Sequence, residues 1–374
     1  MALLYSKSEL EAIAQRLQCC AAEAANEALT GEVFMDHAKK TCGWNKFKFL
    51  KKASKILSEY VPGGVNVFTE PFAVENTIDP GLSSGFILKD AAVVSDILSP
   101  YYGYSFIVFG NDSTGETYIY ILYDGELKFI MDSSLYSSPY MSFVQSVTYD
   151  NGSDVLVLGA YDNIQEYDLS PLLLSIPEQP LAVSSASYPG VSHQYATYNR
   201  IENTVMFSNT AGSEVYRYYP YSNFSTSIPV PSSPTYITTN TSNGQTWVVC
   251  GTLITVINAY SPFVSFTIDL SLSLGFIVSI ERLTYSRELD LFIVPYFNGI
   301  DYKVALLNSD GSVYTGQIYI DYNPVPQGLY YQQLEKYLVA TEFAVIDITT
   351  NSSFYLESAR ILLNDTKNNK LIAC

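Results

Sequence analysis

Histidine, the residue that most often transfers protons in catalysis, is scarce in this sequence. It occurs only as His37 and His193, so a histidine-based triad or metal site would have to use one of these two side chains. A lone histidine more often has a packing role. The chain has no H-E-x-x-H, Walker or G-x-G-x-x-G motif, which removes the usual signals of zinc proteases, P-loop proteins and dinucleotide-binding enzymes.

Carboxylates are the richest source of chemistry, with 37 Asp and Glu residues in a chain of 374. A pair of them facing each other across a funnel could hydrolyse a glycosidic bond. Their abundance prevents the sequence from selecting such a pair. We therefore predict no catalytic residues, and a glycoside hydrolase is the enzymatic alternative. The candidate acids are Asp162, Glu166, Glu214, Glu281, Glu288 and Asp290.

Two loops offer oxygen ligands for a calcium ion, Asp150–Asp154 and Asn308–Ser312. The same residue types form ordinary tight turns, so we predict no cofactor and keep calcium as the alternative. The five cysteines are scattered and include no C-x-x-C pair. This pattern indicates reduced thiols and favours neither a zinc site nor a disulfide framework.

Lysines between residues 46 and 55 are the candidates for contact with a partner. They lie on one face of a predicted helix, Asn45–Tyr60, whose other face is apolar. Residues 1–60 contain nine Lys and Arg against seven Asp and Glu, whereas residues 61–374 contain eleven against thirty. A basic helix on an acidic body suits docking between subunits, and the alternative is a solvated helix face. The predicted docking residues are Lys46, Lys48, Lys51, Lys52 and Lys55.

The change of charge also marks a domain boundary at Pro62-Gly63-Gly64. Residues 1–61 are predicted to form a small helical attachment region, in which Ser8-x-x-Glu11 fits a capping box. Residues 62–374 contain short apolar runs separated by turn residues at steps of about ten, which predict an all-β domain.

A unit of 41–49 residues recurs within the β region. Each copy begins with a strand, most often ending in tyrosine, passes through a polar turn into a wholly apolar strand, and adds a third strand. Five first strands end at residues 149, 198, 239, 285 and 331, and an earlier unit begins with Ser105–Gly110. A period in the forties with three or four strands per unit is typical of β-propeller blades, which bury both faces by stacking around an axis.

Both ends of the β region are predicted to close this ring. The tail offers two strands, Ile361–Leu363 and Lys370–Cys374, which need partners. Strands near Val65–Phe68 and Gly85–Val94 would complete that blade and leave no unpaired edge. We predict a seven-bladed propeller whose N- and C-terminal strands share the closing blade. A six-bladed ring is the next alternative, followed by a β-sandwich pair or a β-helix.

The stretch Asn240–Trp247 is similar to the Asp-box of sialidases, Ser-x-Asp-x-Gly-x-Thr-Trp. It keeps the glycine, threonine and tryptophan but has Ser242 in place of the aspartate. In that family the box forms a turn and is not catalytic, so the resemblance implies a turn at this place.

Several classes of protein are excluded by composition. No apolar segment fit for a secretory signal opens the chain, and no run approaches about 18 apolar residues, so neither a signal peptide nor a transmembrane helix is expected. The net charge of −17 argues against nucleic-acid binding, which depends on neutralising phosphates. Charged residues make up only 15% of the chain, whereas tyrosine occurs 32 times, so Ser, Thr, Asn and Tyr must supply most of the polar surface.

This composition, joined to a predicted propeller and a helical anchor, resembles the β-propeller virion proteins of tailed bacteriophages, such as tail nozzle and hub components. The resemblance implies a non-enzymatic structural or interaction protein, made in the host cytoplasm and located in the virion. Its partners would be other virion or tail proteins, in a homo-oligomeric ring, and a host-surface glycan. The alternative is a carbohydrate-active propeller, either a glycoside hydrolase or a glycan-binding module, with acids and aromatics in its central funnel.

Overall fold

The computed structural model describes most of residues 82–373. The chain divides into two compact units, Met1–Glu75 and Asn76–Cys374, and every described residue belongs to the second. The predicted helical region of residues 1–61, with its docking lysines, and the predicted strand Val65–Phe68 therefore lie outside the described residues. The described positions are 82, 85–134, 141–174, 177–220, 222, 224–321, 325, 327–331, 336–340, 344–348, 352–355, 361–365, 367 and 370–373.

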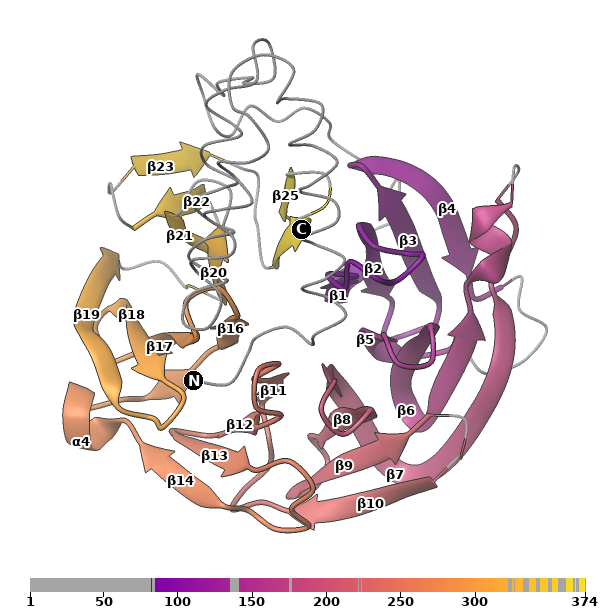
Figure 1. The fold of residues 1–374 in the computed structure, drawn as a ribbon. Helices are drawn as coiled ribbons and strands as arrows, with labels where there is room; N and C mark the ends of the chain where they lie inside the picture. The colour runs from indigo at the N-terminus through magenta and orange to yellow at the C-terminus, as the bar shows by residue number, and fades with distance from the viewer. Residues whose placement is uncertain are drawn as a thin grey trace, which may run out of the picture. The chain divides into compact units, whose positions relative to one another are not determined.

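The second unit is mainly β, as predicted. Its described strands form six antiparallel sheets, none of them closed into a barrel (Figure 1). The first sheet has the order β1-β2-β3-β4 and the second has the order β10-β9-β8-β7-β6-β5. Their strands are β1 (Ile87–Val93), β2 (Tyr104–Gly110), β3 (Thr117–Tyr123), β4 (Glu126–Asp132), β5 (Val144–Asp150), β6 (Val155–Asp168), β7 (Leu181–Asn199), β8 (Thr204–Asn209), β9 (Glu214–Tyr219) and β10 (Phe224–Pro229), with the short helix η2 (Ser170–Leu173) after β6.

Four further sheets follow in chain order. The third is β11-β12-β13-β14, the fourth contains β15 to β19, the fifth is β20-β21-β22-β23, and the sixth is β24-β25. Their elements are β11 (Tyr236–Thr239), β12 (Thr246–Cys250), β13 (Leu253–Ile257), β14 (Phe266–Asp269), α4 (Ser271–Leu274), β15 (Ser279–Ile280), β16 (Thr284–Ser286), β17 (Leu291–Phe297), β18 (Tyr302–Asn308), β19 (Val313–Asp321), β20 (Gln327–Tyr331), β21 (Lys336–Ala340), β22 (Ala344–Asp347), β23 (Ser352–Tyr355), β24 (Leu362–Asp365) and β25 (Lys370–Ala373).

The wholly apolar strand of each predicted repeat is an interior strand of its sheet. Every residue of β8 and of β12 is buried, as are six of the seven residues of β17. Since successive side chains of a strand point to opposite faces, both faces of these sheets must be covered. The continuous apolar pattern is the consequence.

The first copy of the repeat is displaced by one strand from the prediction. Ser105–Gly110, expected as a first strand, lies in β2, and β1 precedes it. The expectation that Gly85–Val94 completes the C-terminal blade is therefore wrong, because β1 pairs with β2 while β24 pairs with β25. The pattern was misleading because β1 has Lys89 and Asp90 at its centre and lacks an aromatic end.

Two long strands of the second sheet each pair with different neighbours along their length, and one of them, β7, passes from one repeat into the next. The first part of β6 pairs with β5 and its second part, from Tyr161, pairs with β7; β7 then pairs with β8 from His193 onward. Tyr161 and Asp162 are exposed, and Asp162 has a φ of 63°. Along a regular strand, even-numbered and odd-numbered residues face opposite sides. Leu158 before this point and Tyr167 after it nevertheless enter the same apolar cluster, so the alternation changes between them. The chain therefore turns at these residues, and the second part of β6 is the predicted third strand of the repeat.

The hydrophobic core is divided among the spaces between successive sheets. One cluster joins β2 and β3 to β5 and β6, another joins β8 and β9 to β11 and β12, and another joins β17 and β18 to β20 and β21. Between the third and fourth sheets, the fully buried rings of Trp247 and Phe292 stack with their centroids 3.6 Å apart. Each of these sheets therefore shares its core with a neighbour in chain order.

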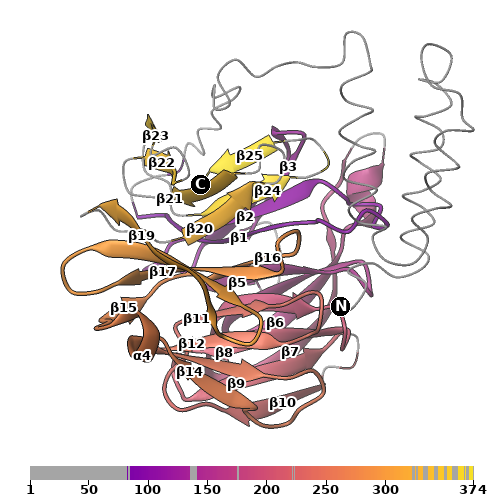
Figure 2. The same cartoon turned by 60° about the vertical axis from the view of Figure 1, so that its left-hand side comes forward.

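The innermost strands contact one another in a closed series. β1 contacts β5, β7 contacts β11, β11 contacts β16, and β16 contacts β20. β24 contacts β20 as well as β1 and β2, and these four strands lie together in Figure 2. Since β5 and β7 belong to one sheet, the series runs through all six described sheets and returns to β1.

A tyrosine at the end of the first strand fixes the following turn in three repeats. Its hydroxyl donates to an Asp or Asn five residues later, whose φ of 54–57° lies in the left-handed region that these two residue types tolerate. Ser99 and Ser242 of the preceding repeats contact the first and third of these hydroxyls at 2.8 and 2.6 Å, so the turns of neighbouring repeats are joined. The pairs are Tyr149–Asp154 at 2.6 Å, Tyr198–Asn203 at 2.7 Å and Tyr285–Asp290 at 2.8 Å.

Candidate functional site

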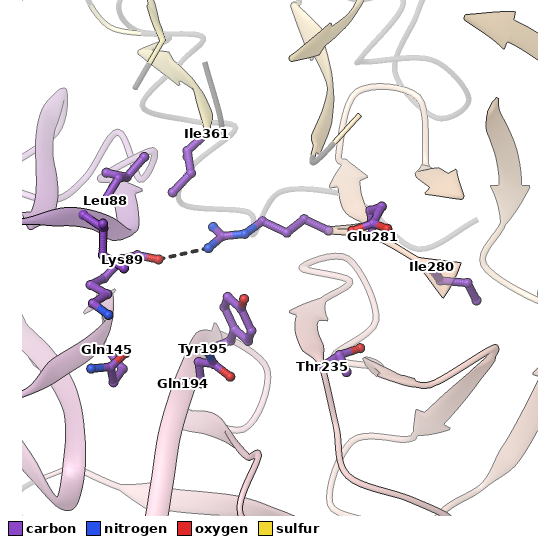
Figure 3. Close-up of a pocket in the computed structure, with 11 residues that line it drawn as sticks. Leu88, Lys89, Gln145, Gln194, Tyr195, Thr235, Ile280, Glu281 and Ile361 are labelled. Carbon is purple, nitrogen blue, oxygen red and sulfur yellow. Dashed lines mark hydrogen bonds between the residues drawn. The ribbon is translucent and has the colours of Figure 1, made fainter. Parts of the chain in front are cut away.

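A pocket of about 400 Å³ lies among the innermost strands. Its lining comes from β1, β5, β7 and β15 and from positions beside β11, β15 and β24, so five of the six described sheets contribute (Figure 3). The lining residues are Ile87, Leu88, Lys89, Gln145, Gln194, Tyr195, Thr235, Ile280, Glu281, Arg282 and Ile361.

Arg282, between β15 and β16, joins the fourth sheet to three others. Its Nη2 donates to the Lys89 carbonyl oxygen at 3.0 Å, the dashed line in Figure 3, and its Nη1 lies 3.2 Å from Asp90 Oδ1. The guanidinium carbon lies 4.8 Å from the ring centroid of Tyr195 and 5.4 Å from that of Tyr236, both within the range of cation–π contacts. One side chain thus contacts β1, β7 and β11.

Asp90 is the buried partner of this arginine, with 6% of its surface exposed. Its Oδ2 accepts a 3.0 Å hydrogen bond from the Val147 backbone nitrogen of β5. Burial raises the pKa of Asp90 to about 6 because desolvation penalises the charged form, and the positive charge of Arg282 opposes this shift. Asp90 and the linking role of Arg282 were not predictable from the sequence, because each residue lies within an ordinary strand pattern.

Gln327 links the fourth, fifth and sixth sheets through its side-chain amide. Its Oε1 accepts a 2.9 Å hydrogen bond from the Leu362 backbone nitrogen, and its Nε2 lies 3.4 Å from both the Leu362 carbonyl oxygen and Thr284 Oγ1. The amide therefore bonds to both backbone polar groups of Leu362, as a neighbouring strand would. β24 is held beside β20 by this side chain.

Of the six predicted candidate acids, the structure places one, Glu281, in the pocket, where it accepts a 2.8 Å hydrogen bond from Ser279 Oγ. It is the single carboxylate among the described lining residues, so they do not supply the pair that glycoside hydrolysis requires. Glu166 is buried in β6 and accepts a 2.7 Å bond from Ser184. The others are Asp162 in the turn of β6, Glu214 at the start of β9, and Glu288 and Asp290 in the turn before β17.

His193 is part of the apolar core and does not line the pocket. It is fully buried, and its ring centroid lies 5.6, 5.1 and 5.7 Å from those of Tyr188, Phe207 and Tyr216. Neither ring nitrogen has a hydrogen-bond partner in the described part of the chain. Burial lowers the pKa of His193 to about 3, so the imidazole is neutral near neutral pH. His37 lies outside the described residues.

Both loops proposed for calcium form tight turns in which carboxylates bind the backbone. Asp150 Oδ1 accepts a 2.8 Å bond from the Gly152 nitrogen, and Asp310 Oδ1 accepts one of 2.8 Å from the Ser312 nitrogen. The other acid of the first loop, Asp154, accepts the tyrosine bond described above. Across the described ranges, no three His, Cys, Asp or Glu residues are grouped so as to hold a metal ion. Among the cysteines, Cys250 is described, and it is buried and free.

The stretch similar to the Asp-box joins β11 to β12 as a turn. Asn240 Oδ1 accepts bonds of 2.8 and 3.3 Å from the backbone nitrogens of Ser242 and Asn243, which confirms the expected turn.

A second motif, Gly81–Gly85, has the G-x-S-x-G spacing of hydrolase nucleophiles. That chemistry needs a helix after the serine, whereas here β1 begins at Ile87.

Comparison with known proteins assigns no function to this site. No family model and no curated protein matches the sequence. Among solved structures, the chain is similar to a protein of unknown function from Bacteroides caccae, with 13% identity and a TM-score of 0.45 over 64% of this chain and 83% of that chain. Within the described ranges, no helix combines the length and the hydropathy needed to cross a bilayer.

Proposed function

We propose that the β domain, residues 62–374, is a seven-bladed β-propeller. Seven blades follow when the second sheet is divided within β7, because its strands β5–β7 and β7–β10 then count separately beside the other five sheets. The contact series that returns from β24 to β1 supports closure by the C-terminal strands. Clusters shared by successive sheets also suit blades that stack face to face.

We further propose that this propeller is a non-enzymatic platform for interaction and assembly. The observation that carries the proposal is the cross-linking at its centre, where Arg282 contacts the first three sheets and Gln327 joins the last three. Both cations of the pocket bind carboxylates, Arg282 at 3.2 Å and Lys89 at 2.6 Å. Such links would keep the sheets in fixed positions, as a platform requires.

Exposed apolar side chains would supply the contact surface of the platform. The most exposed are Tyr260, Phe263 and Ile300 at 70%, Phe276 at 75% and Leu272 at 85%. A Cβ built on Gly299 would lie 3.4 Å from the Phe276 ring, so Phe276 and Ile300 belong to adjoining loops. Neighbouring exposed apolar residues often mark surfaces that bind other proteins.

The assembly we propose is the virion of a tailed bacteriophage, in which this protein is a tail or tail-associated component. A homo-oligomeric ring would dock on other virion proteins through the basic segment Lys46–Lys55, and a host receptor would be the outer contact. The scarcity of charge, the 32 tyrosines and the net charge of −17 support this proposal by their likeness to such virion proteins.

Electron microscopy and light scattering of the purified full chain test the proposal. We expect particles whose mass is a multiple of 41.6 kDa, with seven radial blades in each subunit. The triple variant Lys48→Glu, Lys51→Glu and Lys52→Glu should remain folded and lose assembly. A control with the same charge change at Lys7, Lys39 and Lys40 should assemble. A monomeric wild-type protein rejects the platform, and assembly of the triple variant rejects its docking segment.

A further inference from the structure

We propose that the central pocket binds a neutral, hydroxyl-rich ligand such as a short oligosaccharide. The pocket is large enough, because small-molecule sites usually enclose roughly 300–1,000 Å³ and this one encloses about 400 Å³. Seven of its eleven lining residues are polar or charged. The four apolar ones are Ile87, Leu88, Ile280 and Ile361.

Several hydrogen-bonding groups of the lining have no partner or only distant partners among the described residues. The Gln194 amide makes no hydrogen bond within the described part of the chain. The Gln145 amide makes two long ones, of 3.4 Å each, to Asp112 and to the Phe143 carbonyl oxygen. Thr235 Oγ1 lies 3.5 Å from its acceptor. An apolar ligand would remove water from these groups and leave their hydrogen-bonding capacity unsatisfied, which is unfavourable.

The charges of the pocket disfavour charged ligands. Lys89 already binds Asp112 at 2.6 Å and Arg282 binds Asp90 at 3.2 Å, so an anion would compete with these carboxylates. It would also meet Glu281, which has no ion pair among the described residues, in a chain whose net charge is −17. A cation drawn to Glu281 would approach Lys89 and Arg282. Neutral ligands avoid both repulsions.

Hydroxyl groups match the remaining requirement because each one donates and accepts hydrogen bonds. In Figure 3, Gln194 and Tyr195 on β7 lie near Gln145 on β5, a strand that β7 contacts, and Thr235 lies farther along the wall. Amides present a donor and an acceptor side by side, so Gln194 can bind two adjacent hydroxyls of a sugar ring. The proposal concerns this pocket alone and does not depend on assembly into a ring.

Binding of neutral trisaccharides to the full chain tests the proposal. Maltotriose, cellotriose and triacetylchitotriose are the neutral probes. Citrate and spermidine are the anionic and cationic comparisons, and calorimetry measures the binding of each. We expect at least one trisaccharide to bind more tightly than either charged probe. Gln194→Leu removes the amide and keeps most of the bulk, so the affinity should fall about tenfold. Gln245→Leu is the matched control, since Gln245 is half-buried in the β11–β12 turn, outside the pocket.

Three results would overturn the proposal. The first is that no neutral trisaccharide binds, and the second is that citrate or spermidine binds more tightly. The third is an equal loss of affinity in Gln194→Leu and Gln245→Leu when both variants unfold at the wild-type temperature. None of these results would affect ring formation, so the failure of this proposal is distinguishable from failure of the platform.

Discussion

The buried histidine of β7 should make the stability of this protein depend on pH in a way that one substitution removes. His193 has a folded-state pKa of about 3 because burial penalises the imidazolium, against 6.5 for an unperturbed histidine. Below about pH 6.5 the unfolded chain therefore takes up a proton that the folded chain refuses. The stability due to neutral His193 is complete above that pH and is lost as the pH falls toward 3.

The expected loss follows from the free energy of proton binding, about 1.4 kcal/mol for each pH unit. Between about pH 7.5 and pH 4.5, only the two units below 6.5 contribute, so the loss is about 3 kcal/mol. Asp90 acts in the opposite direction, because its folded pKa of about 6 lies above its unfolded value of 3.8. Its contribution therefore increases stability as the pH falls through 6.

His193→Phe isolates the histidine, because Asp90, His37 and every other titrating group remain in both proteins. Phenylalanine also suits a ring site bounded by Tyr188, Phe207 and Tyr216. Urea unfolding, followed by the fluorescence of the buried Trp247, would give the free energy of unfolding at both pH values. Between about pH 7.5 and pH 4.5, we expect the free energy of unfolding to fall by about 3 kcal/mol more in the wild-type protein than in His193→Phe. Equal losses would show that His193 is protonated in the folded state and would refute the reasoning.

Three further substitutions test contacts between sheets and within the second sheet. Arg282→Leu should lower the free energy of unfolding in urea by about 3–5 kcal/mol, because it leaves Asp90 buried without its cation. Adding Asp90→Asn to this variant should restore part of the lost stability, and the absence of any restoration would contradict the ion pair. Tyr285→Phe should cost about 1 kcal/mol through its lost hydroxyl bonds, whereas the exposed Tyr314→Phe should cost almost nothing. Gly159→Ala should lower the melting temperature, with a cost of about 1–3 kcal/mol, because its Cβ would clash with Ser146 and with the Phe207 ring at 2.7 Å.

The repeat was predictable because it depends on local chemistry. Continuous apolar strands such as β12 report that both faces of a sheet are covered. The tyrosine before each of three turns donates a hydrogen bond to a residue five positions later, for example from Tyr285 to Asp290, so the pair is visible in the sequence. Both signals lie within a few residues of one another, so the sequence displays them directly.

The centre was not predictable because its contacts join distant parts of the chain. Asp90 and Arg282 are separated by 192 positions, and neither residue departs from what a strand and its flank usually contain. The predicted sheet for β1 was wrong for the same reason, because Asp90 at the polar centre of β1 pairs with Arg282 of the fourth sheet. The six candidate acids were chosen by residue type, and only Glu281 reaches the pocket.

The 192-residue separation between Asp90 and Arg282 has a consequence for synthesis of the protein. A ribosome adding roughly 5–20 residues per second would leave Asp90 without its arginine for about 10–40 s after it emerges. During that interval the first sheet has one uncovered face and an uncompensated acid. Since β24 must also emerge before it can contact β1, the first sheet gains its contacts with the C-terminal strands only after Leu362–Asp365 have been synthesised.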